Sequence, residues 1–396
     1  MKIGIDCQLI DLEYKGGINS YLFGLIEGLL STNSRHDFIV FVNKEKKIAF
    51  IKKLSNPNIK VVELANHSSL LRKFILLIPF LLGSVYLWKL FNNIYNNFFL
   101  INSKIEKNCD VLYSASTTIN SYNLKIPTIV SMHDIQQYHY PEFFSKYELN
   151  LRKLNFINTT KNVSYIQASS NFIKQDLLKH FENLNHEQIV VINEGVNYEK
   201  FQKNKSNTIF EKYNLPDRFL FYPAQLWEHK NHITILKALN EIKKNNDEIP
   251  LVLCGAKYNA FFKIEEFIKN NNLKKIFYLG KVSDEDLLSL YQNASFLIVA
   301  ALYESSSLPI LEAAASGLPI IAASTPPNIE YGDHFKINYF EPTNHKELST
   351  LLKKVFISNF DVQDEITFNK KNIFNFTWMK QANKYIQFLE SKIEVK

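Results

Sequence analysis

The sequence predicts an α/β protein with two domains, each built on a parallel β-sheet that is covered by helices. Short apolar runs typical of strands alternate along the whole chain with helical patterns. Several of these runs are apolar on both faces, as expected of strands that lie beneath helices on both sides. The length of 396 residues also exceeds what one hydrophobic core usually supports. Together these observations favour two Rossmann-like halves.

The predicted strands fall into two sets along the chain. The first set comprises residues 2–8, 37–43, 59–65, 110–116, 127–134, 164–170 and 188–196. The second comprises residues 219–225, 249–256, 275–281, 294–301 and 318–324. In open α/β sheets, ligands bind beyond the carboxyl ends of the strands. We therefore expect two sheets that face a cleft.

The segment between the two sets, residues 197–218, is polar and has little apolar periodicity, so it is the predicted connection. Near the end of the chain, Trp378, Ala382, Ile386 and Leu389 recur at helical spacing. They predict a terminal helix that packs back on the first domain. The expected domains are therefore residues 1–200 and 201–375, followed by a helix over 376–396.

The charge and the cysteines limit the class of protein. The net charge of +7 is too small to indicate nucleic-acid binding. Cys7, Cys109 and Cys254 are far apart, which excludes a disulfide framework and close metal-binding pairs. The first residues lack the apolar run and cleavage site of a secretory signal. We expect a cytoplasmic protein with reduced thiols whose mature chain begins at Met1.

One apolar run bears on membrane contact. Residues 74–88 contain no charge, and basic residues lie on both sides of them. A membrane-spanning helix needs about 20 apolar residues, and Pro79 and Gly83 interrupt this run. Two interpretations stay open, which are a buried helix of the first domain and a helix in the lipid headgroup region. Residues 1–107 hold 14 Lys and Arg against 8 Asp and Glu, so an anionic membrane at the inner face of the cell membrane is the expected contact.

Two segments of the first half place polar groups at the ends of strands. Gly16 and Gly17 precede a helical pattern, where backbone N–H groups can approach a phosphate. A tight turn with positive φ is the alternative. His133 and Asp134 end a buried strand, so His133 could contact a sugar hydroxyl or move a proton. A structural contact between the two side chains is the alternative.

In the second half, Lys230 follows a predicted strand and begins a helix. An ammonium group there suits a diphosphate leaving group, although a solvent-facing lysine is the alternative. His229 and His232 lack the further ligand that a zinc site needs. Glu312 lies in an otherwise apolar helix, and a carboxylate there requires a partner unless it points to solvent.

These segments together resemble the retaining glycosyltransferases of family 4, which have the GT-B fold. The resemblance covers nearly the whole chain, and its most specific part is the pair Glu304 and Glu312 within YESSSLPILEAAASGLPII. The GG pair, the HD pair, the NEGV turn at residues 193–196 and the segment PAQLWEHKNH support it. The last segment is similar to bacterial transferases of polysaccharide and lipopolysaccharide synthesis that use mannose or rhamnose donors.

The resemblance implies a role for each residue. Glu312 would bind the ribose hydroxyls of a GDP- or UDP-linked sugar, Glu304 would contact the sugar, and Lys230 would neutralise the diphosphate. His133 would lie near the reacting centre. The remaining nucleotide-sugar-binding candidates are Gly16, Gly17, Gln225, Ser307, Leu308 and Pro309. No metal and no cofactor are implied.

The chain departs from the family at two places. Gln225 stands where the family often has an arginine, and Ser305–Ser307 replace a glycine-rich loop. The expected function is transfer of a hexose to a saccharide or polyprenyl-linked acceptor in cell-surface polysaccharide synthesis. A nucleotide-sugar epimerase on the same fold and a non-catalytic nucleotide-sugar binding protein stay open. A dehydrogenase is disfavoured because no G-x-G-x-x-G loop follows the first strand.

Overall fold

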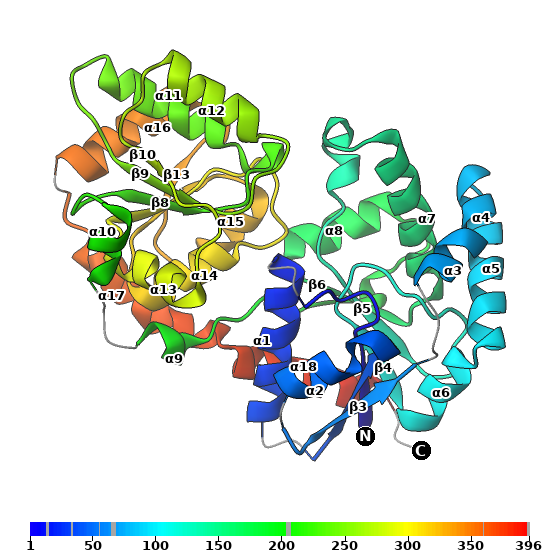
Figure 1. The fold of residues 1–396 in the computed structure, drawn as a ribbon. Coiled ribbons are helices and arrows are strands. Elements are labelled where there is room, and N and C mark those ends of the chain that lie inside the picture. Colours follow the sequence, from blue (N-terminus) through cyan, green and yellow to red (C-terminus); the bar gives the residue numbers. More distant parts are fainter. Residues whose placement is uncertain are drawn as a thin grey trace. The chain divides into compact units, whose positions relative to one another are not determined.

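The computed structural model describes residues 1–12, 16–32, 35–54, 56–64, 69–202, 207–358 and 360–393. The chain forms two compact units (Figure 1). The first unit comprises Met1–Glu194 together with Trp378–Lys396, and the second comprises Gly195–Thr377. Residues 195–200, which we expected in the first domain, therefore belong to the second unit.

The first unit is built on a seven-stranded sheet in the order β3-β2-β1-β4-β5-β6-β7. All of its neighbouring strands are parallel, and central β1 pairs Lys2 with Asp37 and Ile3 with Val111. The strands are β1 (Lys2–Asp6), β2 (Asp37–Val42), β3 (Ile59–Glu63), β4 (Val111–Ser114), β5 (Thr128–Met132), β6 (Tyr165–Ala168) and β7 (Ile189–Val191). Strands β2, β4 and β5 are almost wholly buried, as their apolar sequences predict.

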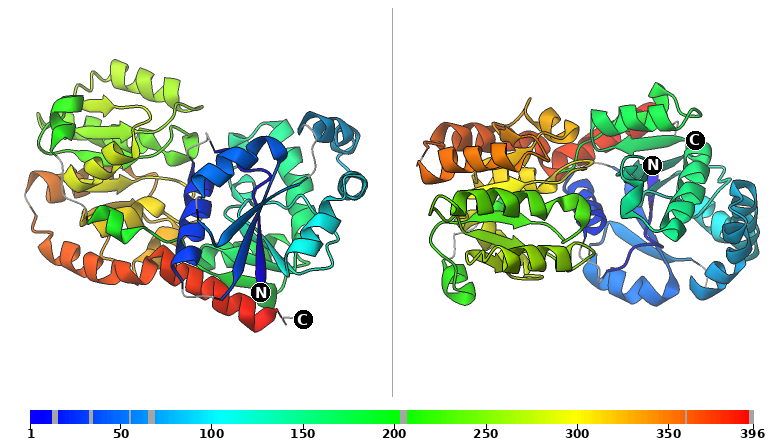
Figure 2. Two further views of the ribbon diagram at one scale, coloured as in Figure 1. Left: turned by 60° about the horizontal axis from the view of Figure 1, so that its bottom comes forward. Right: turned by 90° about the horizontal axis from the view of Figure 1, so that it is seen from above.

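Helices connect these strands, and the last helix of the chain returns to them. They are α1 (Gly17–Ser31), α2 (Lys47–Lys53), α3 (Ser69–Ile75), α4 (Leu77–Leu81), α5 (Val85–Phe98), α6 (Ile101–Asn108), α7 (Lys146–Asn162), α8 (Asn171–His180) and α18 (Trp378–Lys392). Trp378, Tyr385 and Leu389 of α18 lie in the same buried cluster as Leu22 and Leu25 of α1. The predicted packing of the terminal helix on the first domain is confirmed, and both views of Figure 2 show α18 against α1.

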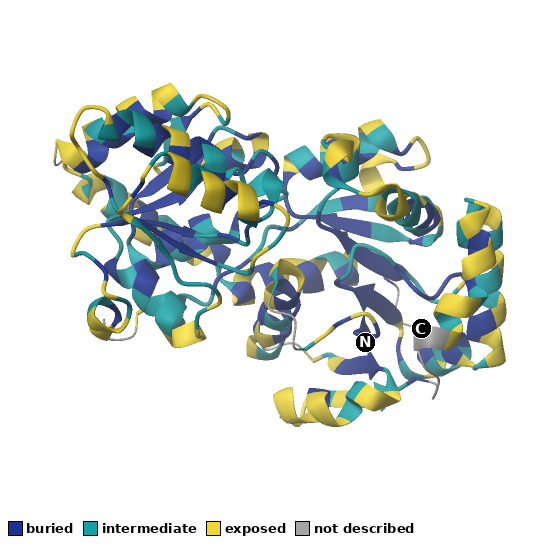
Figure 3. Ribbon diagram, turned by 45° about the horizontal axis from the view of Figure 1, so that its top comes forward, coloured by how far each residue is buried: buried dark blue, intermediate teal, exposed yellow. Residues whose placement is uncertain are grey.

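The second unit holds a six-stranded parallel sheet in the order β10-β9-β8-β11-β12-β13. Its strands are β8 (Leu220–Pro223), β9 (Leu251–Cys254), β10 (Ile276–Tyr278), β11 (Phe296–Val299), β12 (Ile320–Ala323) and β13 (Asn338–Phe340). Its helices are α9 (Tyr198–Phe201), α10 (Thr208–Tyr213), α11 (His232–Lys243), α12 (Phe261–Asn270), α13 (Asp284–Asn293), α14 (Leu308–Ser316), α15 (Pro326–Tyr331), α16 (His345–Leu352) and α17 (Gln363–Asn372). In both units most strands are largely buried, whereas the helices carry both buried and exposed residues (Figure 3).

Two segments differ from the sequence prediction. Residues 197–218 contain α9 and α10, and Phe201, Ile209 and Leu215 are buried in a core of the second unit. This segment is therefore part of the second unit. The apolar run of residues 74–88 is divided among α3, α4 and α5. In the described part of the chain, no helix has both the length and the apolar character needed to cross a membrane.

Candidate nucleotide-sugar site

Two neighbouring strands of the second unit bring Lys230 and Glu304 together. Strands β8 and β11 run parallel and are hydrogen-bonded to each other, so the loops that follow them leave the same edge of the sheet. The Lys230 Nζ atom lies 2.6 Å from Glu304 Oε1. The Leu302 amide also donates to the carbonyl of His229 at 2.8 Å, which joins the two loops through their backbones. Lys230 is therefore held in an ion pair, and the solvent-facing alternative is wrong.

The backbone around Lys230 is fixed by its neighbours. Asn231 adopts a left-handed conformation with φ of 56°, and its side-chain amide donates to the carbonyls of Ala300 and Pro342. The Tyr222 hydroxyl donates to the carbonyl of Lys230 at 2.7 Å. These bonds position the ammonium group before any ligand arrives, which is what electrostatic stabilisation of a leaving group requires.

Next to this pair lies α14, with Ser307 as its N-cap and Gly317 as its C-cap, where a φ of 76° ends the helix. The Ser307 side chain is fully buried, and its hydroxyl makes no hydrogen bond among the described residues. A buried hydroxyl without a partner is costly, so a ligand oxygen would satisfy it. Pro309 has no N–H, so Leu308 rather than Pro309 offers an amide at this helix end.

Glu312 lies on α14 and faces α13. Its Oε2 atom accepts a hydrogen bond of 2.6 Å from the hydroxyl of Tyr291, so the alternative of a solvent-facing side chain is wrong. Burial raises the pKa of the Glu312 carboxyl to about 7, although the Tyr291 bond acts in the opposite direction. A carboxylate in this state gains from further hydrogen-bond donors. Sequence reasoning missed Tyr291, which lies 21 residues earlier in the chain.

An aromatic pair beside Gln225 was also missed. The Trp227 indole donates to Gln225 Oε1 at 3.0 Å. The Trp227 ring stacks on Tyr258 with centroids 3.7 Å apart and an interplanar angle of 15°. The only sign of this stacked pair in the sequence is that one aromatic residue occurs in each of the loops after β8 and β9. Gln225 thus holds a tryptophan at the position where the family often has an arginine.

In the first unit, Gly16 and Gly17 form the start of α1. Gly16 is extended, with φ of −152°, so the alternative of a turn with positive φ is wrong. A Cβ added at Gly17 would meet no atom within 4 Å. Among the described residues, no side chain caps the start of this helix. The N-terminus of a helix is an arrangement that suits an anion.

His133 is brought close to the start of α1. Its ring packs edge-on against Tyr21, with centroids 4.6 Å apart. The Nε2 atom lies 2.9 Å from the carbonyl oxygen of Ala115, so Nε2 must carry the proton and donate it. Burial lowers the pKa of His133, which favours the neutral ring. Asp134 pairs with Arg152, and the described hydrogen bonds include none between His133 and Asp134.

His229 and His232 do not form a metal site with a third ligand among the described residues. Burial and the charge of Lys230 lower the pKa of His232 to about 3. The ring packs against Tyr222 with centroids 4.8 Å apart. His232 is therefore a neutral core residue.

The chain is similar to several known proteins. Residues 176–372 match the model of the family described as Glycosyl transferases group 1. The O-antigen chain mannosyltransferase RfbU of Salmonella typhimurium is 26% identical over 242 residues, 60% of this chain and 64% of that protein. The O-antigen chain mannosyltransferase B of Escherichia coli is 23% identical over 201 residues, 50% of this chain and 52% of that protein. The matches thus span less than two thirds of each relative.

Among solved structures, Anabaena Alr3699/HepE in complex with UDP and glucose is similar with a TM-score of 0.71. The similarity covers 99% of this chain and 100% of that chain at 18% identity. It confirms the predicted architecture of two Rossmann-like domains. The chain therefore carries a domain of the glycosyl transferases group 1 family and has the GT-B fold.

Proposed function

We propose that the chain is a retaining glycosyltransferase that moves a hexose from a nucleoside-diphosphate sugar to a saccharide or lipid-linked acceptor in cell-surface polysaccharide synthesis. The observation that carries the proposal is the Lys230–Glu304 pair beside the N-terminal end of α14. A ligand with a diphosphate and a sugar would need a cation, a helix terminus and a carboxylate close together, so this arrangement supports the proposal.

Lys230 and α14 would bind the diphosphate. As the bond between the sugar and the diphosphate breaks, negative charge grows on the leaving group, and a fixed ammonium with helix N–H groups stabilises it. The unpartnered hydroxyl of Ser307 would donate to the same group. Lys230 would then exchange its contact with Glu304 for one with phosphate, which frees Glu304 to accept hydrogen bonds from the sugar.

Glu312 would bind the nucleoside. The two hydroxyls of a ribose can donate to one carboxylate, and hydrogen bonds to an ionised acceptor are stronger than neutral ones. In the first unit, neutral His133 would contact the sugar near the reacting carbon. The start of α1 at Gly16 and Gly17 would serve the phosphate and acceptor side. Cationic and helix-terminal groups supply the stabilisation that a metal gives in other transferases.

Mannose is the first donor sugar to test, because both curated relatives are named as mannosyltransferases. UDP and glucose are bound in the similar Anabaena protein, so the panel should include GDP-mannose and UDP-glucose. Transfer of labelled hexose to saccharide and polyprenyl-linked acceptors supports the proposal. Binding without transfer points to a binding protein, and an altered sugar formed without acceptor points to an epimerase.

The role of Lys230 is tested in the same assay. We expect Lys230→Ala to lower kcat/KM at least ~100-fold, because removing one group that stabilises developing charge typically costs that much. Lys237→Ala is the matched control, since Lys237 is an exposed lysine of the neighbouring helix α11. Full activity in a folded Lys230→Ala variant would contradict the assigned role.

We also propose that α3–α5 rest on an anionic bilayer. On α5, Tyr86, Leu90, Ile94 and Phe98 recur every four residues, and all four are exposed. The side that faces the protein is also partly apolar, since Trp88 and Tyr95 are buried there beside Asn92 and Asn96. The outer side of α5 therefore carries a row of apolar residues where a helix whose outer face meets water carries polar ones.

Hydrogen bonds satisfy the inner asparagines. Arg72 donates to Asn92 Oδ1 at 2.6 Å, and Asn96 donates to the carbonyl of Asn120 at 2.7 Å. The apolar outer face continues onto α4, where Ile78 and Leu81 are also exposed. A contiguous exposed apolar surface of this kind marks an interaction site rather than ordinary surface.

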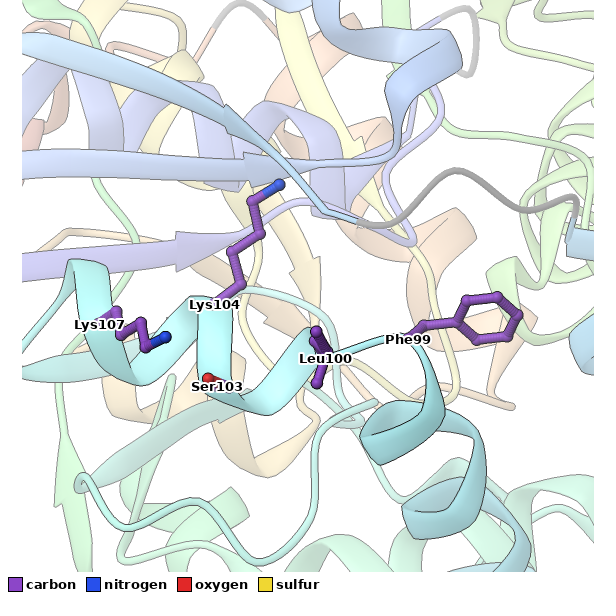
Figure 4. Close-up of a pocket in the computed structure, with 5 residues that line it drawn as sticks. All are labelled: Phe99, Leu100, Ser103, Lys104 and Lys107. Carbon is purple, nitrogen blue, oxygen red and sulfur yellow. The ribbon is translucent and has the colours of Figure 1, made fainter.

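The charges around this face suit anionic lipid. No Asp or Glu occurs from residue 64 to residue 105, whereas Lys73 and Lys89 lie within that stretch. Beside the end of α5, Lys104 and Lys107 of α6 line a hollow next to Phe99 and Leu100 (Figure 4). Ammonium groups next to apolar side chains match a lipid whose phosphate lies above its acyl chains.

Vesicle sedimentation tests this contact. We expect binding to vesicles that contain phosphatidylglycerol, weaker binding to phosphatidylcholine alone, and loss of binding when Leu90, Ile94 and Phe98 are all changed to Ser. Phe262→Ser on α12 is the control, because Phe262 is an equally exposed aromatic residue of the second unit. Unchanged sedimentation of the triple variant would contradict the proposal, as would a shift of the wild-type protein to a dimer through this face.

A further inference from the structure

Three side chains of the first unit form a cluster that the glycosyltransferase site does not use. They are His139, in the loop after β5, and Asp176 and His180, which lie one turn apart on α8. The His139 Nε2 atom lies 2.6 Å from Asp176 Oδ2. The His180 Nε2 atom lies 3.4 Å from Asp176 Oδ1. One ligand atom from each residue lies within 4.8 Å of those of the other two.

His180 gives the second observation. Its Nε2 atom is buried but makes no hydrogen bond among the described residues, although it points toward the Asp176 carboxylate. A buried polar atom without a partner costs free energy. The Asp176 side chain is itself only 5% exposed, with one oxygen toward each imidazole. A cation between the three groups would satisfy both residues of α8.

The rings are held in place by aromatic neighbours. Tyr138 stacks on His180 with centroids 4.5 Å apart and an interplanar angle of 30°. The edge of Tyr138 also contacts Phe181 of the same helix end. His139 and His180 stand nearly perpendicular, at 80°. The nitrogen atoms are therefore positioned before binding, which lowers the entropic cost of closing a site around an ion.

We propose that His139, Asp176 and His180 bind a divalent transition-metal ion, with Zn²⁺ as the best fit. Two imidazoles and one carboxylate are a ligand set that Zn²⁺ accepts, whereas Ca²⁺ and Mg²⁺ prefer all-oxygen sites. Zinc bonds of about 2.0–2.2 Å in tetrahedral geometry place ligand atoms roughly 3.4 Å apart. The separation of His180 from Asp176 already fits, and His139 would withdraw from Asp176 by less than about 1 Å.

The ion would join the loop after β5 to the end of α8. That loop begins with His133 and Asp134, so the metal would restrain the segment that carries them without touching the donor site. The fourth position would hold water. This inference does not depend on the proposed transfer reaction, because it concerns metal binding and its effect on folding.

Calorimetric titration of the tag-free, EDTA-treated full chain with ZnCl₂ tests the inference. We expect one equivalent to bind and the melting temperature to rise, because a ligand that binds the folded state stabilises it. His139→Ala and His180→Ala should each raise the Kd roughly 10-fold or more, since even outer-shell changes cost about that much. His186→Ala is the control, because His186 is an exposed histidine just after α8, and it should bind zinc as the wild type does.

A second measurement uses only the wild-type chain, so it does not depend on whether a variant folds. Co²⁺ added to the wild-type chain should give the intense visible absorption of a tetrahedral site, and one equivalent of Zn²⁺ should remove it. Absence of that absorption would overturn the inference. Zinc binding that persists unchanged in both folded histidine variants would also overturn it, and would leave Asp176 as a hydrogen-bond acceptor only.

Discussion

At the scale of single residues, Glu312 shows how the surroundings of one side chain set the conditions for binding. The sequence predicted that this carboxylate needs a partner, because it lies among Leu311 and alanines. It could not identify Tyr291, since that contact depends on how α13 and α14 pack. Likewise, the position of Lys230 after a strand was readable, but its ion pair with Glu304 requires β8 and β11 to be neighbours.

The raised pKa of Glu312 predicts a pH dependence of donor binding. With a pKa of about 7, the carboxyl is ionised above neutral pH and becomes protonated below it. Because ribose hydroxyls bind the ionised form better, the affinity for a nucleoside-diphosphate sugar should fall below pH 7, by up to about tenfold per pH unit. The diphosphate of such a sugar does not itself titrate in this range. Calorimetric titrations between pH 5.5 and 8.5 measure the trend.

Glu312→Gln separates this carboxylate from other titrating groups. At pH 8.5 the variant should bind roughly 10- to 100-fold more weakly, since hydrogen bonds to charged groups are worth about 1.5–3 kcal/mol. Its affinity should then vary little with pH. A variant that keeps the wild-type pH profile would show that another group causes it.

At the scale of elements, the alternation of strands and helices could be predicted from the sequence. Which residues lie on the buried face of a helix could not always be predicted. Twelve strands were predicted, but β13 was missed because its three residues include the polar Asn338, whereas the equally short β7 and β10 are wholly apolar. The apolar run of residues 74–88 left open whether a buried helix or a helix in the lipid headgroup region forms, and the burial of Asn92 and Asn96 on α5 depends on distant partners. Helices α9 and α10 were also not predicted, because their sequences are mostly polar. Their few apolar residues nevertheless lie in a core of the second unit.

The contact between α1 and α18 predicts the effect of one glycine. A Cβ added at Gly28 would overlap the backbone carbonyl of Trp378. We therefore expect Gly28→Ala to lower the free energy of unfolding by about 1–3 kcal/mol, as overpacking does, although alanine favours a helix by about 1 kcal/mol. Gly17→Ala in the same helix meets open space and should not destabilise. Denaturant unfolding of both variants measures the difference, and equal stability would show that α18 does not pack this closely.

At the scale of the whole molecule, one chain forms two units of the same architecture, for which we propose different tasks. The second unit holds Lys230, Glu304, Ser307 and Glu312, and the family match falls mostly on it. The first unit holds His133, the start of α1 and the exposed apolar residues of α4 and α5. The two-domain architecture followed from length and alternation alone. The sequence also predicted that the last helix of the chain packs on the first unit. That prediction depended on the apolar stripe of α18 as well.

The most direct test of this account is the melting temperature of the chain with nucleoside diphosphates and with the matching nucleosides. We expect GDP or UDP to raise it by several degrees and the nucleosides to raise it much less, because we propose that Lys230 and α14 bind the diphosphate. Lys230→Ala should lose most of the rise, while Lys237→Ala keeps it. If no diphosphate raises the melting temperature, or if Lys230→Ala responds as the wild type does, the second unit does not hold the donor site described above.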